Sequence, residues 1–316
     1  MGKGKKTTYA LIAAFLGYAI FGFSFMFSKL ALETATPFVL LGVRFLIAFI
    51  ALNLVILVMH LLNLAGVCGG FGFSLKNKPV GILLLLGLTE PVLYFICENY
   101  GIELSSSAFA GTIIALIPVA AIVLDLTVMH ERVSTLQIVC AGLSVVGVLL
   151  TALGSVMQGF SIWGLVLLLG AVFSGALFGA LSRKASVNFN PIEKTWVMFA
   201  MGAVVFVAMG LIQSAGDFEN RVMVPLSTGS FWMSAVYLAV ASSVVAFLLL
   251  NFATEYITVT QFSLFINVTT VISILAGVFI RGEPFAWYQM IGAAIIILCV
   301  YVSSVRAGKT AAPEEN

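Results

Sequence analysis

The chain alternates long apolar segments with short polar connections. Each apolar segment is close to the ~20 residues that a helix needs to cross the hydrocarbon core of a membrane. Pro37, Pro79 and Pro191 stand where segments begin, a position that tolerates the missing amide donor of proline. The pattern predicts an all-α integral membrane protein with ten transmembrane helices, over residues 8–28, 38–61, 79–98, 107–128, 135–153, 161–181, 192–212, 231–251, 259–279 and 286–305.

Composition agrees with a membrane protein and excludes several other classes. Hydrophobic residues make up 61% of the 316 residues and charged residues only 9%, whereas a soluble domain carries roughly 25% charged residues. The net charge of +2 and the lack of a large basic cluster give no reason to expect nucleic acid as a partner. The four cysteines have no spacing typical of disulfide frameworks or metal sites, so we expect no cofactor and no metal.

An internal repeat organises the chain. Residues Asn99–Val148 align without a gap on Asn251–Val300, and this places Glu131 on Glu283. Because charged residues are scarce, the coincidence indicates a duplication. We expect a first five-helix repeat over 8–153 and a second over 161–305, with a short N-terminus at 1–7 and a disordered tail at 306–316.

Basic residues in the short loops predict the orientation, because they accumulate on the cytoplasmic side of a membrane. With the N-terminus inside, the outer loops hold only Lys29, Arg221 and Arg281. The inner loops hold Lys3, Lys5, Lys6, Lys76, Lys78, Arg132, Arg183, Lys184, Arg306 and Lys309. Both termini are therefore expected in the cytoplasm, and an odd number of helices per repeat would invert the second repeat relative to the first.

Glu90 is the most informative polar residue. It follows Pro79 by a helical rise of about 17 Å in a core of about 30 Å, which places it near mid-depth. A carboxyl group there costs ~2.5–3.5 kcal/mol, so it faces a cavity, has a partner or is protonated. Pro91 should bend the helix, and Tyr94 lies one turn further on the same face. We expect Glu90 to bind a cationic group, a proton, or each in turn; the alternative is a structural hydrogen bond to a neighbouring helix.

Further polar residues near mid-depth are candidates for the substrate site. The counterparts of Glu90 and Pro91 in the second repeat are Ser242 and Ser243, which predicts one acidic wall and one hydroxylic wall. Buried asparagine in a membrane needs partners, and serine or threonine often bonds its own helix backbone, so structural roles remain the alternative. The candidates for binding substrate are Glu90, Tyr94, Tyr18, Asn267, Thr112, Ser242 and Ser243.

Other charged residues suggest coupling or gating. Arg44 lies slightly inside the outer surface and needs an acid or carbonyl groups, and Glu33, Glu98 or Glu103 could supply the acid. A structural or gating pair is favoured for Arg44, and binding of a substrate carboxylate is the alternative. Glu98 is expected at the wet outer end of the third helix. Asp125 lies near the inner surface and could pair with Arg132.

A different, structural role is expected for the two repeated glutamates. Glu131 and Glu283 precede the fifth and tenth helices, where a negative charge complements the dipole of the helix that follows.

The chain resembles the EamA-type branch of the drug/metabolite transporter superfamily. The helix of Pro118, the loop with Glu131 and the small-residue helix of Cys140 to Gly147 carry the resemblance, as do Arg281-Gly282-Glu283-Pro284 before Gly292-Ala293-Ala294 and the basic Arg44 in the second helix. The resemblance implies ten helices in two halves and the transport, commonly export, of small organic molecules, often against protons.

These observations favour a secondary active transporter in the plasma membrane of a prokaryote. It would export a small organic metabolite such as an amine or amino acid by alternating access, with protons coupled through Glu90. Alternatives are a facilitative carrier or an importer of a quaternary amine, a channel, or an intramembrane enzyme. The chain lacks a P-loop and H-E-x-x-H. The expected partners are the substrate, protons and the lipid bilayer; the oligomeric state is open.

Overall fold

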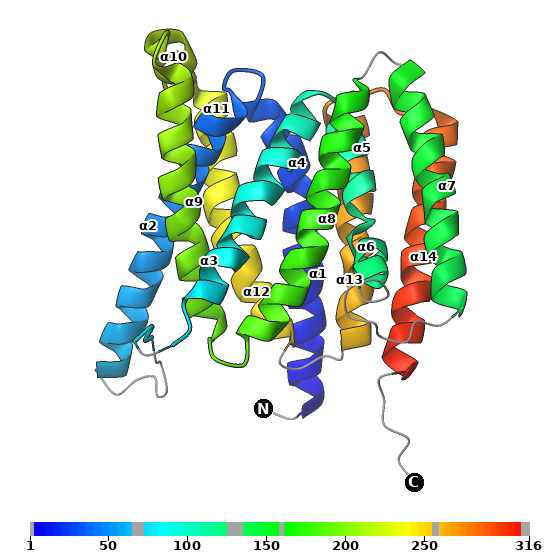
Figure 1. Cartoon of the computed structure of the whole chain (residues 1–316), viewed down its shortest axis with the longest axis horizontal. Helices are drawn as coiled ribbons and strands as arrows, with labels where there is room; N and C mark the ends of the chain where they lie inside the picture. The colour runs from blue at the N-terminus through cyan, green and yellow to red at the C-terminus, as the bar shows by residue number, and fades with distance from the viewer. Residues whose placement is uncertain are drawn as a thin grey trace.

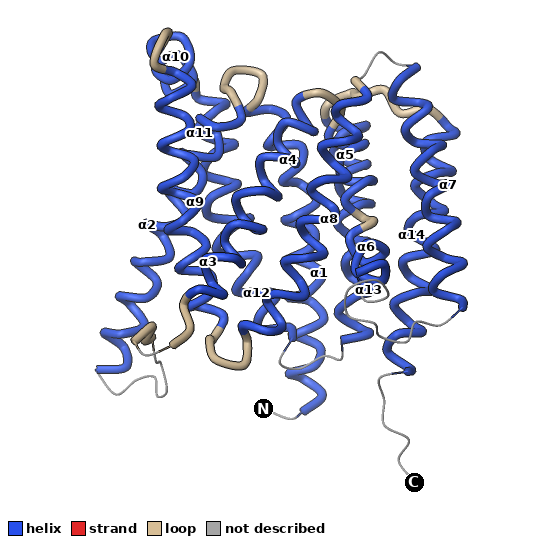
Figure 2. Tube along the Cα trace, viewed as in Figure 1, coloured by secondary structure: helices blue, strands red, loops and turns tan. Residues whose placement is uncertain are grey.

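The computed structural model describes residues 3–64, 73–76, 78–124, 135–157, 161–254 and 259–310. In these ranges all regular structure is helical (Figure 2). The N-terminal half contains α1 Lys3–Ala31, α2 Pro37–Leu64, α3 Gly81–Gly87, α4 Tyr94–Glu103, α5 Ser107–Ile114, α6 Ile117–Leu124 and α7 Thr135–Met157. The C-terminal half contains α8 Ile162–Ala185, α9 Pro191–Ser214, α10 Val224–Ser227, α11 Gly229–Val236, α12 Ala246–Thr254, α13 Val259–Leu275 and α14 Trp287–Thr310.

Several long helices are interrupted by wider, π-helical turns. Leu88–Leu93 joins α3 to α4, and Tyr237–Val245 joins α11 to α12. Glu219–Met223 precedes α10, and Ala276–Ile280 extends α13. The predicted third helix is therefore bent near its middle, and the predicted eighth helix widens into π-helical turns at the corresponding place.

The length and composition of the helices confirm a multi-pass, all-helical membrane protein. Seven segments are long and apolar enough to cross a membrane: Thr8–Ala31, Pro37–Leu64, Gly81–Glu103, Ser107–Leu124, Ile162–Ser182, Pro191–Ser214 and Gly229–Leu250. Three further apolar helices are shorter in the described residues: Ile138–Thr151, Val268–Ile280 and Trp287–Val302. The prediction of ten crossings stays a prediction.

The helices stand side by side in a bundle (Figure 1). α1 begins and α14 ends at one face of the bundle, which we call the terminal face. The opposite face, where α1 ends and α5 begins, is the distal face.

The most extensive helix pairings join the two halves of the chain. α2 packs against α9, α7 against α14, α1 against α12 and α13, and α4 against α8. Glycines allow the closest of these approaches. A methyl group on Gly292 would lie 2.6 Å from the carbonyl oxygen of Gly147, so α7 and α14 can meet backbone to backbone only because both positions lack a side chain. The core of the molecule therefore lies between its halves.

Candidate functional site

A cavity of about 500 Å³ lies inside the bundle. Its walls come from α1, α2, the bent α3–α4 segment, α5, α6, α8, α9, the α11–α12 segment and α13. Most of its lining is apolar, with several phenylalanines, and a small number of polar groups project into it. This combination of a large apolar surface with sparse polar groups is typical of a site for a small organic molecule.

The bend between α3 and α4 presents an acid to this cavity. Glu90 has φ −142° and ψ 116°, far from helical values, and Pro91 follows it without an amide hydrogen. The carbonyl oxygen of Thr89 accepts the backbone N–H of Tyr94 in a wider turn and, in addition, a hydrogen bond of 2.8 Å from the Ser174 hydroxyl of α8. The predicted bend at Pro91 is confirmed, and a neighbouring helix satisfies the backbone there.

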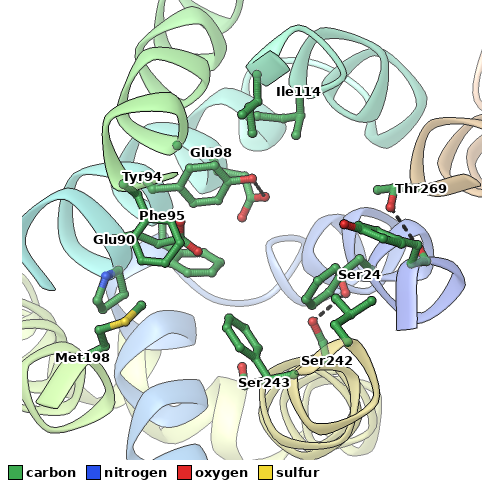
Figure 3. Close-up of a pocket in the computed structure, with 18 of the residues that line it drawn as sticks. Ser24, Glu90, Tyr94, Phe95, Glu98, Ile114, Met198, Ser242, Ser243 and Thr269 are labelled. Carbon is green, nitrogen blue, oxygen red and sulfur yellow. Dashed lines mark hydrogen bonds between the residues drawn. The ribbon is translucent and has the colours of Figure 1, made fainter. Parts of the chain in front are cut away.

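Three polar side chains follow one face of this segment: Glu90, Tyr94 and Glu98. The Tyr94 hydroxyl donates a 3.0 Å hydrogen bond to Glu98 Oε1, and Asn99 Nδ2 lies 3.4 Å from Glu98 Oε2. The Glu90 carboxylate, by contrast, has no hydrogen-bond or ion-pair partner among the described residues, although it lines the cavity. Figure 3 shows the three side chains together on one side of the pocket. The backbone thus holds Glu90 at the cavity wall, while its carboxylate oxygens have no hydrogen-bond or ion-pair partner among the described residues.

Arg44 of α2 reaches the cavity next to this acidic face. The residue is only 4% exposed. Its Nε donates a 3.3 Å hydrogen bond to the Ser243 hydroxyl, and its guanidinium lies 4.4 Å from the centre of the Phe95 ring. Among the described side chains no direct ion pair joins Arg44 to Glu33, Glu98 or Glu103, but Glu98 lines the same cavity and interacts electrostatically with Arg44.

The opposite wall carries hydroxyl groups. Ser24 of α1 donates a 2.8 Å hydrogen bond to Ser242, and Thr269 of α13 donates one of 3.0 Å to the carbonyl oxygen of Tyr18. Ser243 bonds the carbonyl oxygen of Leu238 at 2.9 Å. Figure 3 places Ser24, Ser242 and Thr269 across the pocket from Glu90. The arrangement of one acidic and one hydroxylic wall matches the expectation from the sequence.

A polar network closes the bundle at the distal face. Lys29 Nζ donates to the carbonyl oxygens of Ile102, Glu103 and Ser105 at 2.9, 3.0 and 2.7 Å. Arg281 pairs with Glu33 at 2.6 Å.

Glu283 completes the distal network, but not as the sequence predicted. Its carboxylate accepts hydrogen bonds from the backbone nitrogens of Ser107 and Ala108 at 3.2 and 3.0 Å. Glu283 therefore caps α5 of the N-terminal half, rather than the helix that follows it, and the earlier expectation is wrong for this residue.

The cavity extends toward the terminal face. Its lining includes Ser182 near the end of α8 and Pro191 and Lys194 at the start of α9, and Figure 1 places this connection at the terminal face. Lys194 Nζ donates to the hydroxyls of Ser182 and Ser186 at 3.2 and 2.7 Å. A polar network thus closes the bundle at the distal face, whereas the lining of the cavity reaches the terminal face.

Comparison with known proteins identifies the family. A sequence model of the EamA-like transporter family matches residues 8–153 and again residues 162–305. The chain belongs to the EamA-like transporter family. It is therefore a membrane transporter of the drug/metabolite transporter superfamily, as the resemblance in the sequence implied.

Relatives and a solved structure agree with this assignment. The uncharacterized transporter YcxC of Bacillus subtilis (strain 168) is 35% identical over 305 residues, which cover 96% of this chain and 95% of YcxC. The uncharacterized transporter YetK of the same organism is 25% identical over 307 residues, covering 96% and 88%. A protein crystal structure, 17% identical, superposes with a TM-score of 0.63 over 96% of this chain and 99% of that chain. That likeness shows the fold.

Two expectations about site residues of this EamA-like transporter are wrong. Thr112 is fully buried outside the cavity lining, and its hydroxyl bonds the carbonyl oxygen of Ala108 in its own helix at 2.8 Å. Glu98 is 7% exposed and lines the cavity, instead of lying in water at a helix end. The helix continues to Glu103, so Glu98 sits more than one turn inside it.

The remaining predicted residues divide into two groups. Tyr18, Arg44, Glu90, Tyr94, Ser242 and Ser243 all line the cavity of this EamA-like transporter. Asp125, Glu131 and Arg132 lie outside the described residues, as does the side chain of Asn267.

Ser24 and Thr269 also line the cavity, and neither was among the candidate substrate-binding residues predicted from the sequence. A lone serine among the phenylalanines of the first apolar segment is the signal that could have pointed to Ser24. Among the side chains that the structure describes, no group of three His, Cys, Asp or Glu could hold a metal ion.

Proposed function

We propose that this EamA-like transporter is a secondary active exporter of a small organic metabolite that carries an amino group. Glu90 is the observation that supports the proposal best. It is an acid at the bend of a membrane helix, it faces a cavity of suitable size, and no described protein group occupies its carboxylate. An ionisable side chain in that position is expected to bind a ligand.

The proposed route is alternating access through the cavity between the two halves. The two family matches support two five-helix repeats at 8–153 and 161–305, and the shared face of the first and last helix supports an even number of crossings. We propose ten crossings, with the second repeat inverted, so that each repeat supplies a gate on one side of the membrane.

The terminal face is proposed to be cytoplasmic, in the plasma membrane of a prokaryote. Basic residues gather in the loops assigned to that face, and relatives of the chain occur in Bacillus subtilis and Archaeoglobus fulgidus. With that orientation the described state is closed to the outside by Lys29, Arg281 and Glu283 and extends toward the cytoplasm. Such a state is the one that loads a substrate for export.

Proton coupling is proposed to pass through Glu90. The carboxyl can hold either a proton or the amino group of the substrate, but not both at once. Entry of a proton from outside would then release the cation, and the cytoplasmic amine would displace the proton in the inward state. Exchange of this kind stores the energy of the proton gradient in a substrate gradient.

Transport by purified protein in liposomes tests the proposal. Vesicles would be loaded with a mixed extract of bacterial metabolites, a proton gradient would be imposed, and the lost compounds would be identified by mass spectrometry. We expect gradient-dependent loss of at least one amine-bearing compound. Glu90→Gln should reduce its rate by about 10- to 100-fold, as expected when a charge-assisted contact is lost. Glu103→Gln, on the same helix but outside the cavity, is the matched control. Equal rates in wild type and Glu90→Gln would contradict the role of Glu90; no gradient-driven loss of any compound would contradict the transporter mechanism.

Thiol labelling tests the proposed orientation and closed distal face. In a variant without the native cysteines, Ser182→Cys and Glu33→Cys would report on the two ends of the cavity. We expect a membrane-impermeant reagent to label Ser182→Cys only from the cytoplasmic side and Glu33→Cys only from outside. Labelling of both positions from one side would exclude the proposed topology.

A further inference from the structure

α5 and α13 pack against each other at the distal end of the bundle. α6 continues the chain from α5 toward the terminal face (Figure 1), and in the described residues its contacts with α13 are few. A methyl group on Gly111 of α5 would overlap the Ser273 hydroxyl of α13, so the two helices come this close only because Gly111 has no side chain. Thr270 Oγ1 donates a 3.3 Å hydrogen bond to the carbonyl oxygen of Gly111, and both residues line the cavity. The contact between α5 and α13 therefore forms part of the distal wall of the cavity.

The Glu283 carboxylate holds the start of α5 in this position. It accepts hydrogen bonds from the Ser107 and Ala108 backbone nitrogens and from the Ser107 hydroxyl, which lies 2.8 Å from both of its oxygens. The carboxylate fits there because Gly277 has no side chain: a methyl group at this position would lie 2.5 Å from Glu283 Oε2 and 3.0 Å from the Ala108 β-carbon. Gly282 has a φ of +66°, which favours glycine, and the Glu283 backbone nitrogen after it donates to the Gly277 carbonyl oxygen at 3.0 Å. Two glycines thus let one carboxylate reach the other half of the chain.

Lys29 of α1 holds the end of α4, on the other side of the corner between α4 and α5. Its three hydrogen bonds go to the carbonyl oxygens of Ile102, Glu103 and Ser105. A positive charge at the C-terminal end of α4 and the negative charge of Glu283 at the N-terminal end of α5 each complement a helix dipole. Both charges come from outside the corner, so the contacts can break without unfolding either helix.

The helix that begins with α5 is interrupted near the middle of the membrane segment. α5 is eight residues long and ends at Ile114, and α6 begins at Ile117. Pro118 has no amide hydrogen to donate to the carbonyl oxygen of Ile114, so the helical hydrogen-bond pattern stops there. In the second half Thr270 stands in the place of Pro118, and α13 is continuous over Val259–Leu275. α5 is therefore joined to α6 by two non-helical residues, the kind of connection that can absorb a hinge rotation.

We propose that α5 is the moving part of the outer gate, that it turns about Ala115–Leu116, and that the contact of Glu283 with Ser107 and Ala108 is the latch that holds it against α13. The proposal rests on the proposed function, and it adds which element moves and which contact must break. Release does not leave Glu283 without a partner, because Arg281 Nε, two residues away on the same connection, lies 3.2 Å from its carboxylate.

Thiol labelling of the cavity tests the latch without a substrate. The reporter is Ser24→Cys in the full-length chain without its native cysteines, because Ser24 lines the cavity. A membrane-impermeant reagent is added to right-side-out and to inside-out vesicles, and the side of the distal face is the one from which Glu33→Cys is labelled. Gly277→Ala should displace the carboxylate and raise the labelling rate from the distal side by about tenfold or more, as for the loss of a charge-assisted contact. Gly142→Ala is the matched control, because nothing lies within 4 Å of its added methyl group.

Glu283→Gln is the second variant, in case Gly277→Ala impairs folding. It removes the charge with little change in size and should raise the same rate by about threefold or more. Thermal unfolding in detergent checks that each variant is folded before it is compared.

A reversible crosslink tests whether α5 must leave α13 during transport. In the double variant Ser107→Cys, Gly277→Cys the two new side chains would meet, because a β-carbon at position 277 lies 2.9 Å from Ser107 Oγ. We expect the oxidised protein to release the identified substrate from loaded vesicles at less than about a tenth of the rate of the reduced protein, and a thiol reductant to restore release. Ser107→Cys alone, treated with the same oxidant, is the control.

The outcomes separate the gate from the transport function. Unchanged labelling in both latch variants would overturn the latch, and undiminished release by the crosslinked protein would overturn α5 as the gate. Rapid labelling of the reporter from the distal side without any latch variant would overturn both, since that end would not be closed. If the wild type releases no compound at all, the transport function falls, while the labelling result still decides the latch.

Discussion

The bent α3–α4 segment and the bent α11–α12 segment occupy corresponding places in the two halves of the chain. Both interrupt an α-helix with wider turns, at Leu88–Leu93 and at Tyr237–Val245. The first carries Glu90 and Pro91 and the second carries Ser242 and Ser243. The backbone bend recurs where the side chains differ. The wider turns are therefore common to both halves, while the acid and the proline are present in the first half alone at this position.

The two bends also satisfy their backbones differently. In the first, Ser174 of α8 donates to the carbonyl oxygen of Thr89, which also accepts the Tyr94 N–H. In the second, Ser243 donates to the carbonyl oxygen of Leu238 within its own segment. The Glu90 side chain has no hydrogen-bond partner among the described residues, whereas Ser243 is bonded by its own helix and by Arg44. The two walls are not interchangeable.

Moving the acid from one wall to the other is the strongest test of this difference. In the double variant Glu90→Ser, Ser242→Glu, the acid would face Ser24 and would lack the proline bend and Tyr94. We expect transport in liposomes to fall by about 10- to 100-fold, as for the loss of a charge-assisted contact. Ser242→Ala alone is the control and should stay within about threefold of wild type. Near-normal transport by the double variant would mean that the cavity needs an acid at mid-depth on either wall.

Tyr94→Phe tests the hydrogen bond between Tyr94 and Glu98, which has no counterpart on the wall that carries Ser242 and Ser243. The corresponding position of the second half is Ala246, so no hydroxyl can play this part there. Without the hydroxyl, Glu98 loses its 3.0 Å donor, and the loss of one such bond should raise KM for the transported compound about three- to tenfold. Transport kinetics would be measured against Tyr100→Phe, which removes a hydroxyl from the same helix outside the cavity. An unchanged KM would show that the Tyr94–Glu98 contact does not shape the site.

Ser174→Ala tests how the first bend is held and has the smallest expected effect. The variant leaves the carbonyl oxygen of Thr89 without its 2.8 Å donor, which should destabilise the protein by about 1 kcal/mol and lower its thermal midpoint by a few degrees. Ser234→Ala removes a buried serine whose hydroxyl donates to the carbonyl oxygen of Ser230 in its own helix, and is the control. If both variants unfold at the same temperature as wild type, the bend does not depend on α8.

The sequence predicts the helices and the acid for a simple physical reason. The length of an apolar helix is set by the thickness of the membrane. A carboxyl group such as that of Glu90 costs free energy in the membrane interior, so it marks a candidate functional residue. The depth of Glu90 in the membrane could therefore be predicted from its separation from Pro79 along the helix. The bend followed from Pro91 alone.

The predictions from the sequence fail for residues whose surroundings depend on which helices pack against one another. Periodicity does not say that α2 packs on α9, so the surroundings of Arg44 could not be derived and an acid was expected where Ser243 and Phe95 stand. Glu98 was misplaced because the helix end was set too early. Thr112 was misjudged because a hydroxyl in a helix most readily bonds its own backbone, and no sequence signal distinguishes it from Ser24.

The role of Glu283 was misjudged for a related reason. A residue just before a helix is expected to stabilise that helix, but Glu283 reaches across to the start of α5 in the other half. Contacts between segments so distant in the sequence leave no local pattern. They become visible only when the two halves are assembled.

The principal helix pairings, α2 with α9, α7 with α14 and α4 with α8, each draw one member from either half. Neither five-helix unit thus encloses an interior of its own. Either half on its own would therefore expose the faces that these pairings bury. The two halves, if expressed today as separate polypeptides, should still find each other and restore the complete bundle.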